Sequence, residues 1–425
     1  MSDILSKNGD VELKVLTINS ANGASVSIRP QCMVLDMYSN LFEKYMSGEV
    51  VVADAQNLQS LLPLVGNETI DICFETPSLN LSYKGWFYIY KMSEKYKLGR
   101  EDVYCLYFIS PEAIASTNRR ISRTFRCNAL NAVVSLFEND IQTEKAVRGD
   151  DSVNRFTYCS NYWTPTKNID YILSRSVDEF GYPTFLFYET NLGFHFTSLN
   201  HLISDENGVV HNFIISEYEK GMGSGEGGVK SSVERDYMQV QEVAYRTGFD
   251  FSERVSGGYY GGTLITYDNI TGRYTEKYIK IDIPKNLNKN GCVVGNAPVA
   301  TNSLMVFAPK SYNNIDDSGD NTDSEYKILR NGIFSRLRNQ QITIKVYGRT
   351  DYFVGQKVNL QVSNSGQSDE KQRWNKLLSG NYLITAVKHQ VKKNFFFSYL
   401  ELSKGSYIDE PEGESSTKSL QKNKT

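Results

Sequence analysis

Apolar and polar residues alternate along both ends of the chain. Residues 70–74 and 86–90 place an apolar or aromatic side chain at every second position, and residues 341–403 continue the pattern near the carboxyl end. A period of two is typical of β-strands with one buried face. Strand-rich segments of this kind favour a small closed barrel, because closure removes exposed strand edges.

Four other stretches have the three- and four-residue spacing of helices. Their apolar stripes are Leu58, Leu61, Leu62 and Val65; Leu130, Val133, Val134, Phe137 and Ile141; Ile169, Ile172, Leu173, Val177 and Phe180; and Val233, Tyr237, Val240 and Ala244. Asp54 is placed to cap the first helix and Gly66 to end it, whereas the last helix is predicted from Ser231 to just before Gly248. Residues 184–197 and 263–281 are predicted to form hairpins.

The two strand-rich ends correspond to each other segment by segment. The matched segments are 66–77 with 355–365, 84–92 with 379–387, and 103–110 with 396–403. Any two antiparallel sheets share an alternation of apolar and polar residues, so the correspondence could reflect that common pattern alone, and this alternative stays open. The common order of a glycine, a strand, a second glycine and a strand pair nevertheless favours a duplicated unit, because repeats arise as whole structural units.

These patterns predict a mainly β fold with α+β insertions, built from two similar small antiparallel β-barrels and two inserted domains. The predicted units are a first barrel over residues 1–110, an α+β insertion over 111–204, a second barrel from 205–230 and 325–407, a helix and strand insertion over 231–324, and a disordered tail over 408–425. The acidic stretch 310–325 is predicted to be a solvated loop.

Composition and charge exclude several classes of function. The 46 Lys and Arg residues nearly balance the 49 Asp and Glu residues, so no strong positive field is available to hold a phosphate backbone, and sequence-specific nucleic-acid binding is not expected. We expect no membrane insertion and assembly in a cytoplasm, because the amino terminus lacks the layout of a signal peptide and no apolar run approaches about 20 residues. Six dispersed cysteines without a CxxC pair predict buried reduced thiols.

The residues that could carry chemistry lack the spacing of known catalytic, metal-binding and phosphate-binding motifs. His195, His201, His211 and His389 are not in an HExxH pattern or at metal-ligand spacing from a cysteine, and packing roles are expected for them. Residues 316–327 superficially suggest a calcium loop, but Asn321 and Lys327 occupy the positions that require Gly and Glu. The glycine-rich residues 221–228 lack the Lys-Ser/Thr of a phosphate loop. No catalytic, cofactor-binding or metal residue is therefore predicted, and the chain is not expected to be an enzyme.

Several segments resemble those of a known family. They read GRTDYFVGQKVNLQV at 348–362, LSGNYLITAVKH at 378–389 and FFSYLELSKGSY at 396–407, with LLPLVGNETIDICFETP at 61–77 and YWTPTKNIDYILSRS at 162–176. In these segments the chain resembles the baseplate hub proteins of contractile-tailed bacteriophages, which are related to the amino-terminal half of type VI secretion spike proteins. Residues 221–228 and 322–330 match no segment of that family.

The resemblance implies a structural role in a virion tail baseplate. It implies a homotrimer whose six barrels form a pseudo-sixfold ring, which adapts a threefold central spike to the sixfold tail tube and leaves a channel for DNA. The implied partners are the central tail-spike protein, a tail-tube initiator or tube protein, and inner baseplate proteins, and no cofactor is implied.

Two other readings stay open. The first is the hub of a type VI-like injection system, which a fused spike would distinguish; no spike repeat follows Tyr407. The second is a carbohydrate-binding or hydrolytic β-protein, which exposed Trp and Tyr beside paired carboxylates would support.

Overall fold

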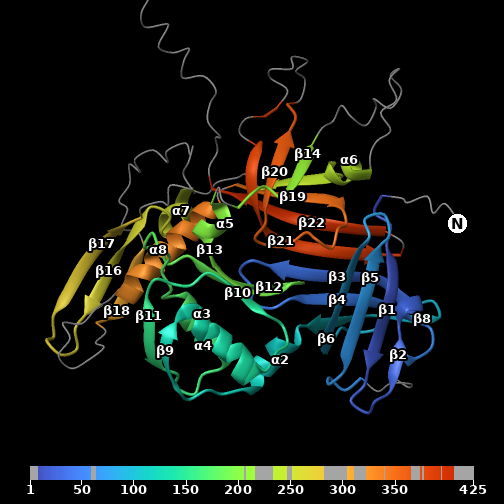
Figure 1. The fold of residues 1–425 in the computed structure, drawn as a ribbon, viewed down its shortest axis with the longest axis horizontal. Helices are drawn as coiled ribbons and strands as arrows, with labels where there is room; N and C mark the ends of the chain where they lie inside the picture. The colour runs from blue at the N-terminus through green and yellow to red at the C-terminus, as the bar shows by residue number, and fades with distance from the viewer. Residues whose placement is uncertain are drawn as a thin grey trace, which may run out of the picture.

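The structure is a computed structural model that describes residues 8–58, 64–204, 207–215, 233–246, 251–281, 304–310, 322–338, 340–364, 374–375, 378–393 and 395–405. The largest element is a continuous 14-stranded sheet, whose two halves lie side by side and are called the first and the second sheet below, and smaller helical and strand units flank them (Figure 1). The predicted glycine-rich segment 221–228, the tail 408–425 and the first half of the calcium-like stretch lie outside the described residues.

The first sheet is formed by the amino-terminal strands. They are β1 (Glu12–Asn19), β2 (Ser25–Ser27), β3 (Cys32–Asn40), β4 (Ser47–Asp54), β5 (Thr69–Thr76), β6 (Leu81–Met92), β7 (Tyr96–Leu98) and β8 (Glu101–Ile109), with the short helix η1 (Arg29–Gln31) after β2. Their order is β3-β4-β8-β6-β5-β1-β2, and β7 extends the edge of β8. Ile70, Ile72 and Phe74 are buried, which confirms the predicted period of two in that segment. In the second predicted segment the period also holds, but Trp86 and Tyr90 are exposed and the intervening Phe87 and Ile89 are the buried residues.

The second sheet repeats that order with strands from the rest of the chain. They are β14 (His211–Ile215), β15 (Glu242–Arg246), β19 (Gln340–Tyr347), β20 (Lys357–Val362), β21 (Gly380–Lys392) and β22 (Phe395–Lys404), arranged as β15-β19-β22-β21-β20-β14. The duplicated sheet is confirmed. The expectation that both barrels are antiparallel throughout is wrong for one strand pair, because β14 runs parallel to β20 whereas β1 runs antiparallel to β5.

The registers of the two sheets agree as well. Gly85 lies opposite Ile72 in the first sheet and Gly380 opposite Leu360 in the second. Each long strand then has one irregularity against its neighbour four residues after the matched glycine, following Ile89 in β6 and Ile384 in β21. A β-bulge at the same place in two sheets is a specific structural feature and not a consequence of alternation.

The third matched segment is displaced by one residue from the prediction. Ile109 lies opposite Tyr88, and Ser403 lies opposite the corresponding Leu383, so Ser403 matches Ile109 and not Ser110. Apolar residues occupy neighbouring positions in β22, so its sequence does not show which face is buried. A slip of one residue exchanges the two faces of a strand, and only the pairing fixes the choice.

An α+β unit follows the first sheet. Its elements are α2 (Pro111–Asn118), β9 (Thr124–Asn128), α3 (Ala129–Ser135), the π-helical turn η2 (Leu136–Ile141), β10 (Val147–Gly149), β11 (Arg155–Cys159), α4 (Pro165–Leu173), β12 (Phe185–Thr190), β13 (Gly193–Ser198) and α5 (Leu199–Ile203). The predicted hairpin is confirmed as β12 and β13. The helix predicted over 130–141 changes to π geometry after Ser135.

The helix after Pro165 is shorter than predicted. It ends at Leu173, and Phe180, which we expected on its buried face, is 61% exposed. The hydroxyl of Ser176 donates to the carbonyl of Ile172 at 2.8 Å, and the Ser174 hydroxyl donates to that of Tyr171 at 2.9 Å. Serine side chains that bond the last carbonyls favour termination of a helix.

A second small unit lies beyond β15. It comprises α7 (Phe251–Ser256), β16 (Gly261–Tyr267), β17 (Tyr274–Lys280), β18 (Met305–Pro309) and α8 (Thr322–Leu337), whereas α6 (Val233–Met238) precedes β15 and contacts β14 and β19 of the second sheet. The hairpin of β16 and β17 is confirmed. The prediction of a solvated loop over 310–325 is wrong from Thr322 onward, because α8 begins there. Further along this helix Ile328 packs in the core of the β16–β17 hairpin and Ile333 packs in the core of the second sheet.

The helix predicted from Ser231 to Gly248 is also wrong in its second half. It ends at Met238, and Ala244 lies in β15 opposite Thr343 of β19. The backbone NH of Gln241 donates to the carbonyl of Lys345 at 2.8 Å, so the chain enters the sheet there. Tertiary strand pairing overrides the local helical pattern.

The short helix predicted after Asp54 lies mainly outside the described residues. The carboxylate of Asp54 accepts a hydrogen bond from the backbone NH of Leu58 at 2.8 Å. Val65, which we expected on the buried face, is 81% exposed.

Candidate assembly site at the join between the two sheets

Strand β21 belongs to both sheets. Residues Gly380 to Leu383 pair with β20, whereas Ala386 to Val391 pair antiparallel with β3. Figure 1 shows β21 in red directly beside β3 in blue. The join unites the two similar sheets into one continuous set of strands.

The second sheet also contributes side chains to the first core. Phe396 of β22 is fully buried, and its ring lies 5.3 Å from that of Phe74 in an edge-to-face arrangement. A Cβ on Gly348 would lie 2.2 Å from the Phe396 ring, so a larger residue could not occupy that position without displacing it. Phe396 therefore ties the second sheet to the first core through Phe74, and Gly348 leaves room for its ring.

Polar side chains form contacts between β3 and β21 on the face of the join that is opposite to Phe396. Asp36 of β3 is 5% exposed and accepts hydrogen bonds from Lys388 Nζ at 2.6 Å and Gln390 Nε2 at 2.9 Å. Asp36 and Gln390 lie directly opposite each other. Because a shift of one residue would separate this carboxylate from both donors, the contacts help to fix the register.

His389 lies at the centre of the join and is buried. Its Nδ1 is 2.9 Å from the hydroxyl oxygen of Ser398, and its ring packs near Phe396. Burial lowers the pKa of His389 to about 4 from the usual 6.5. The imidazole is consequently neutral at neutral pH, and its protonation requires a charge in the packed join.

We expect acid to weaken the fold through His389. The pKa is lower in the folded than in the unfolded chain, so this contribution is fully present above pH 6.5 and is lost as the pH falls toward 4. The loss of unfolding free energy between pH 7.5 and 4.5 is about 2 to 3 kcal/mol for such a shift. Urea unfolding at both pH values should show a smaller difference for His389→Gln than for the wild type. If the difference in unfolding free energy between the two pH values is the same for His389→Gln as for the wild type and for the control His201→Gln, this account is contradicted.

A buried charge cluster attaches the α+β unit to the first sheet. Lys145 Nζ lies 2.9 Å from a Glu112 carboxylate oxygen and 2.6 Å from one of Glu189. Glu189 also accepts hydrogen bonds from the backbone NH of Met46 at 2.8 Å and the Ser110 hydroxyl at 2.5 Å. Burial raises the pKa of Glu189, and the ammonium of Lys145 opposes that rise.

The same unit also contacts the rest of the chain beyond the first sheet. The Arg330 guanidinium of α8, in the second small unit, donates to the Pro183 carbonyl at 2.9 Å, and burial lowers the pKa of Arg330 to about 10. The Asn191 side chain donates to the Thr350 carbonyl at 3.2 Å. The turn between β12 and β13 therefore contacts the segment that follows β19 of the second sheet.

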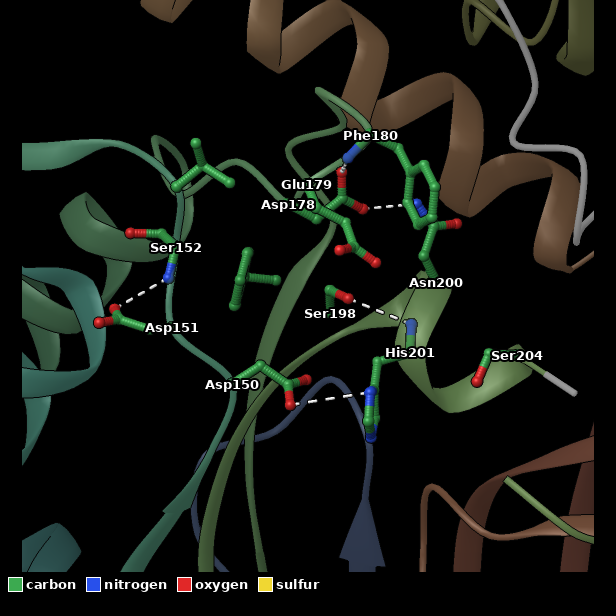
Figure 2. A pocket seen from close by; sticks show the side chains of 12 residues that line it. Asp150, Asp151, Ser152, Asp178, Glu179, Phe180, Ser198, Asn200, His201 and Ser204 are labelled. Carbon is green, nitrogen blue, oxygen red and sulfur yellow. Dashed lines mark hydrogen bonds and ion pairs between the residues drawn. The ribbon is translucent and has the colours of Figure 1, made fainter. Parts of the chain in front are cut away.

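An open pocket of about 590 Å³ lies in the α+β unit (Figure 2). Asp150 faces His201 across it, at 3.7 Å from Nδ1. Asp178 accepts hydrogen bonds from the backbone NH groups of Phe180 at 3.1 Å and Tyr182 at 2.8 Å. These bonds shape the turn after α4, and burial raises the pKa of Asp178. Asp178 therefore supports the local structure.

The structure separates the histidines that the sequence singles out. His195 Nε2 lies 2.9 Å from the Thr190 hydroxyl, and His211 packs edge-to-face on Tyr352. Burial lowers the pKa of both imidazoles. Among the described residues, no group of three or more His, Cys, Asp or Glu could hold a metal ion. In the same part of the chain, no helix has the length and apolar character to cross a membrane.

Five cysteines lie in the described residues, and all are free thiols. The expectation that they are buried is wrong, since Cys159 is exposed and the other four are partly exposed. Cys32 and Cys127 pack at the margin of hydrophobic cores while remaining partly exposed.

Sequence reasoning missed the polar residues that define the join and its supports. Asp36, Lys145 and Glu189 have no distinctive local motif. The one available signal is the alternation of Lys388 and Gln390 with apolar residues in β21, which indicates a strand with a polar face.

The comparison of the whole structure with solved structures places this arrangement among known folds. No family model and no curated protein matches the sequence. The structure is similar to the tail protein from Neisseria meningitidis MC58, at 9% identity and a TM-score of 0.51, over 93% of this chain and 97% of that one. It is also similar to the 43 kDa tail protein of prophage MuSo2 from Shewanella oneidensis, at 10% identity and a TM-score of 0.54, over 93% of this chain and 99% of that one.

The chain has the fold of these tail proteins. The match extends over nearly the full length of both relatives, so it includes the two sheets and the units inserted between them. The resemblance to phage tail proteins that the sequence indicates is thus confirmed at the level of the fold.

Proposed function

We propose that this chain is a structural baseplate hub of a contractile phage-type tail, in which three copies form a ring of six sheets. The observation that carries the proposal is the duplication: two sheets in one chain share their strand order and the position of a bulge. A tube with six equivalent subunits requires six similar surfaces, and a threefold spike requires three. A trimer with an internal duplication supplies both.

The proposed organisation follows from this symmetry. The first barrel spans residues 1–110 and the second comprises 205–230 and 325–407, while the units at 111–204 and 231–324 lie outside the ring. Because β15 pairs with β19, we place Glu242–Arg246 with the second barrel and begin the second insertion after it. The ring encloses a channel through which DNA passes, and the protein is part of the virion.

The proposed partners are the central tail spike on one side and the tube initiator or tube protein on the other, with inner baseplate proteins around the ring. A role without catalysis is supported by the engagement of buried carboxylates in structural contacts. Glu112 and Glu189 bind Lys145, Asp36 binds across the join, and Asp178 shapes a turn.

The assembly state tests this proposal. The purified chain, alone and with a candidate spike protein, should form a ring with six lobes in negative-stain images, and its mass should be that of three chains. A chain that stays monomeric under both conditions would contradict the hub assignment.

A further inference from the structure

An open hollow of about 490 Å³ lies on the outer face of the first sheet, between β6, α2 and the segment that follows η2. Figure 1 shows α2 beside β6, and the two elements are in contact. Trp86 and Tyr88 of β6 line the hollow with their ring centroids 5.6 Å apart, and the Trp86 side chain is 47% exposed. Small-molecule sites have volumes of about 300–1,000 Å³ and combine aromatic walls with a few polar groups.

Three exposed polar side chains also line the hollow. Asn118 ends α2, while Gln142 and Glu144 follow η2. None of the three side chains has a hydrogen bond or ion pair with another described residue. The two amides can each donate and accept hydrogen bonds, and the carboxylate can accept them. This set of free groups suits a ligand that carries several hydroxyl groups.

The backbone of Gln142 has an unusual conformation. Its φ of 61° and ψ of 48° lie in the left-handed region, which a residue with a Cβ adopts at a cost. Its NH donates to the Phe137 carbonyl at 2.8 Å and so closes the π-helical turn η2. Gly or Asn would adopt this conformation more easily, so the turn alone does not explain a glutamine here. Left-handed residues and π-helical turns are frequent at functional sites.

The charged groups of the hollow favour a neutral ligand. Glu112 accepts hydrogen bonds from the Thr143 hydroxyl at 2.6 Å and from Lys145 Nζ at 2.9 Å, so both of its carboxylate oxygens are engaged. Lys145 also binds Glu189, and its charge is balanced within the fold. The carboxylate that remains free is that of Glu144, which would repel a phosphate or another anion.

A second hollow, of about 430 Å³, lies on the other side of Trp86. Because β6 lies between β8 and β5, the second hollow extends over β5, where Asp71 is directly opposite Trp86. Asp71 and Lys84 give this hollow one charge of each sign. Trp86 lines both hollows, so a ligand of two or more linked units can extend across the indole.

We propose that these two hollows form a binding site for a neutral oligosaccharide, with a pyranose ring stacked on Trp86. The C–H groups of a pyranose face carry partial positive charge and the face of an indole carries partial negative charge, so the two attract each other. Asn118, Gln142 and Glu144 then bond to the hydroxyl groups. We expect binding without hydrolysis, because hydrolysis needs a pair of available carboxyl groups and Glu112 is engaged.

A glycan array probed with the full chain tests the site. The probes are neutral oligosaccharides of glucose, galactose, mannose, rhamnose and N-acetylhexosamines, with about two to six units each. At least one series should bind, and calorimetric titration with its trisaccharide then gives the affinity. Trp86→Ala should weaken that affinity at least about tenfold, whereas Trp86→Phe should retain part of it. No binding to any of these probes would overturn the proposal.

Matched variants locate the binding. Tyr96→Ala removes an aromatic side chain that is 67% exposed and lies outside the lining of both hollows, so its affinity should equal that of the wild type. Asn118→Ala changes an exposed residue and should weaken binding about threefold or more, which tests the site even if Trp86→Ala does not fold. An affinity that is the same in Trp86→Ala, Asn118→Ala and the wild type would place the saccharide elsewhere and overturn the site.

A basic peptide separates the saccharide from a cationic partner. Hexa-arginine should not bind in the same titration. If it binds, loses its affinity in Trp86→Ala, and no saccharide binds, the hollow takes a cationic segment and the saccharide proposal is wrong.

Saccharide binding is measured on the isolated chain and does not require the ring. A chain that assembles as three copies but binds no saccharide leaves the hub proposal intact and overturns this site. A chain that binds a saccharide through Trp86 but never assembles supports this site and contradicts the hub proposal.

Discussion

Replacement of Phe396 by Ala is expected to lower the free energy of unfolding by about 3–5 kcal/mol, the usual cost of removing a fully buried aromatic side chain. Phe396 is fully buried and packs edge-to-face against Phe74 of the other sheet. Its loss leaves a cavity where the two sheets meet. Urea unfolding followed by tryptophan fluorescence measures the effect.

The neighbouring residue provides a matched control. Phe395 has the same side chain but is 55% exposed, so Phe395→Ala should change the free energy by less than about 1 kcal/mol. Similar losses for the two variants would show that Phe396 is not part of a shared core.

Replacement of Lys145 by Met is expected to destabilise the protein by about 3 kcal/mol at pH 8, because it leaves two buried carboxylates without their cation. Glu112 is 4% exposed and Glu189 is 3% exposed. Without the ammonium, which opposes the effect of burial, the pKa of Glu189 should rise further in the folded state. The defect should then be smaller at pH 5, where protonation of a carboxyl removes part of the buried charge.

Unfolding of wild type and variant at both pH values measures this dependence. The exposed Lys84, replaced by Met, is the control and should change stability by less than about 0.5 kcal/mol at either pH. A defect in Lys145→Met that is the same at pH 5 and pH 8 would show that lost packing, and not the unpaired carboxylates, causes it.

The strands could be predicted from sequence because their signal is local. Ile72 and Leu360 correspond in the structure as their alternation indicates, since each lies opposite the matched glycine of the next strand. The elements that were predicted wrongly depend on distant contacts. Ala244 fits a helical stripe but pairs with Thr343, which is 99 residues away in the sequence.

The join itself could not be predicted, for the same reason. Asp36 and Gln390 are 354 positions apart, and neither has a motif that announces a partner. Lys145 likewise gains its role only when folding brings Glu112 and Glu189 together. The duplication indicated that two sheets exist, whereas the way in which they share β21 required the structure.

The most direct test of the duplication account combines mass and symmetry on the same particles. Electron microscopy of the assembled chain with its spike should show six similar lobes in the ring, and mass measurement should give three chains. Six lobes with a mass of six chains would mean that each copy supplies one lobe, and this would contradict the claim that the two sheets of one chain are equivalent.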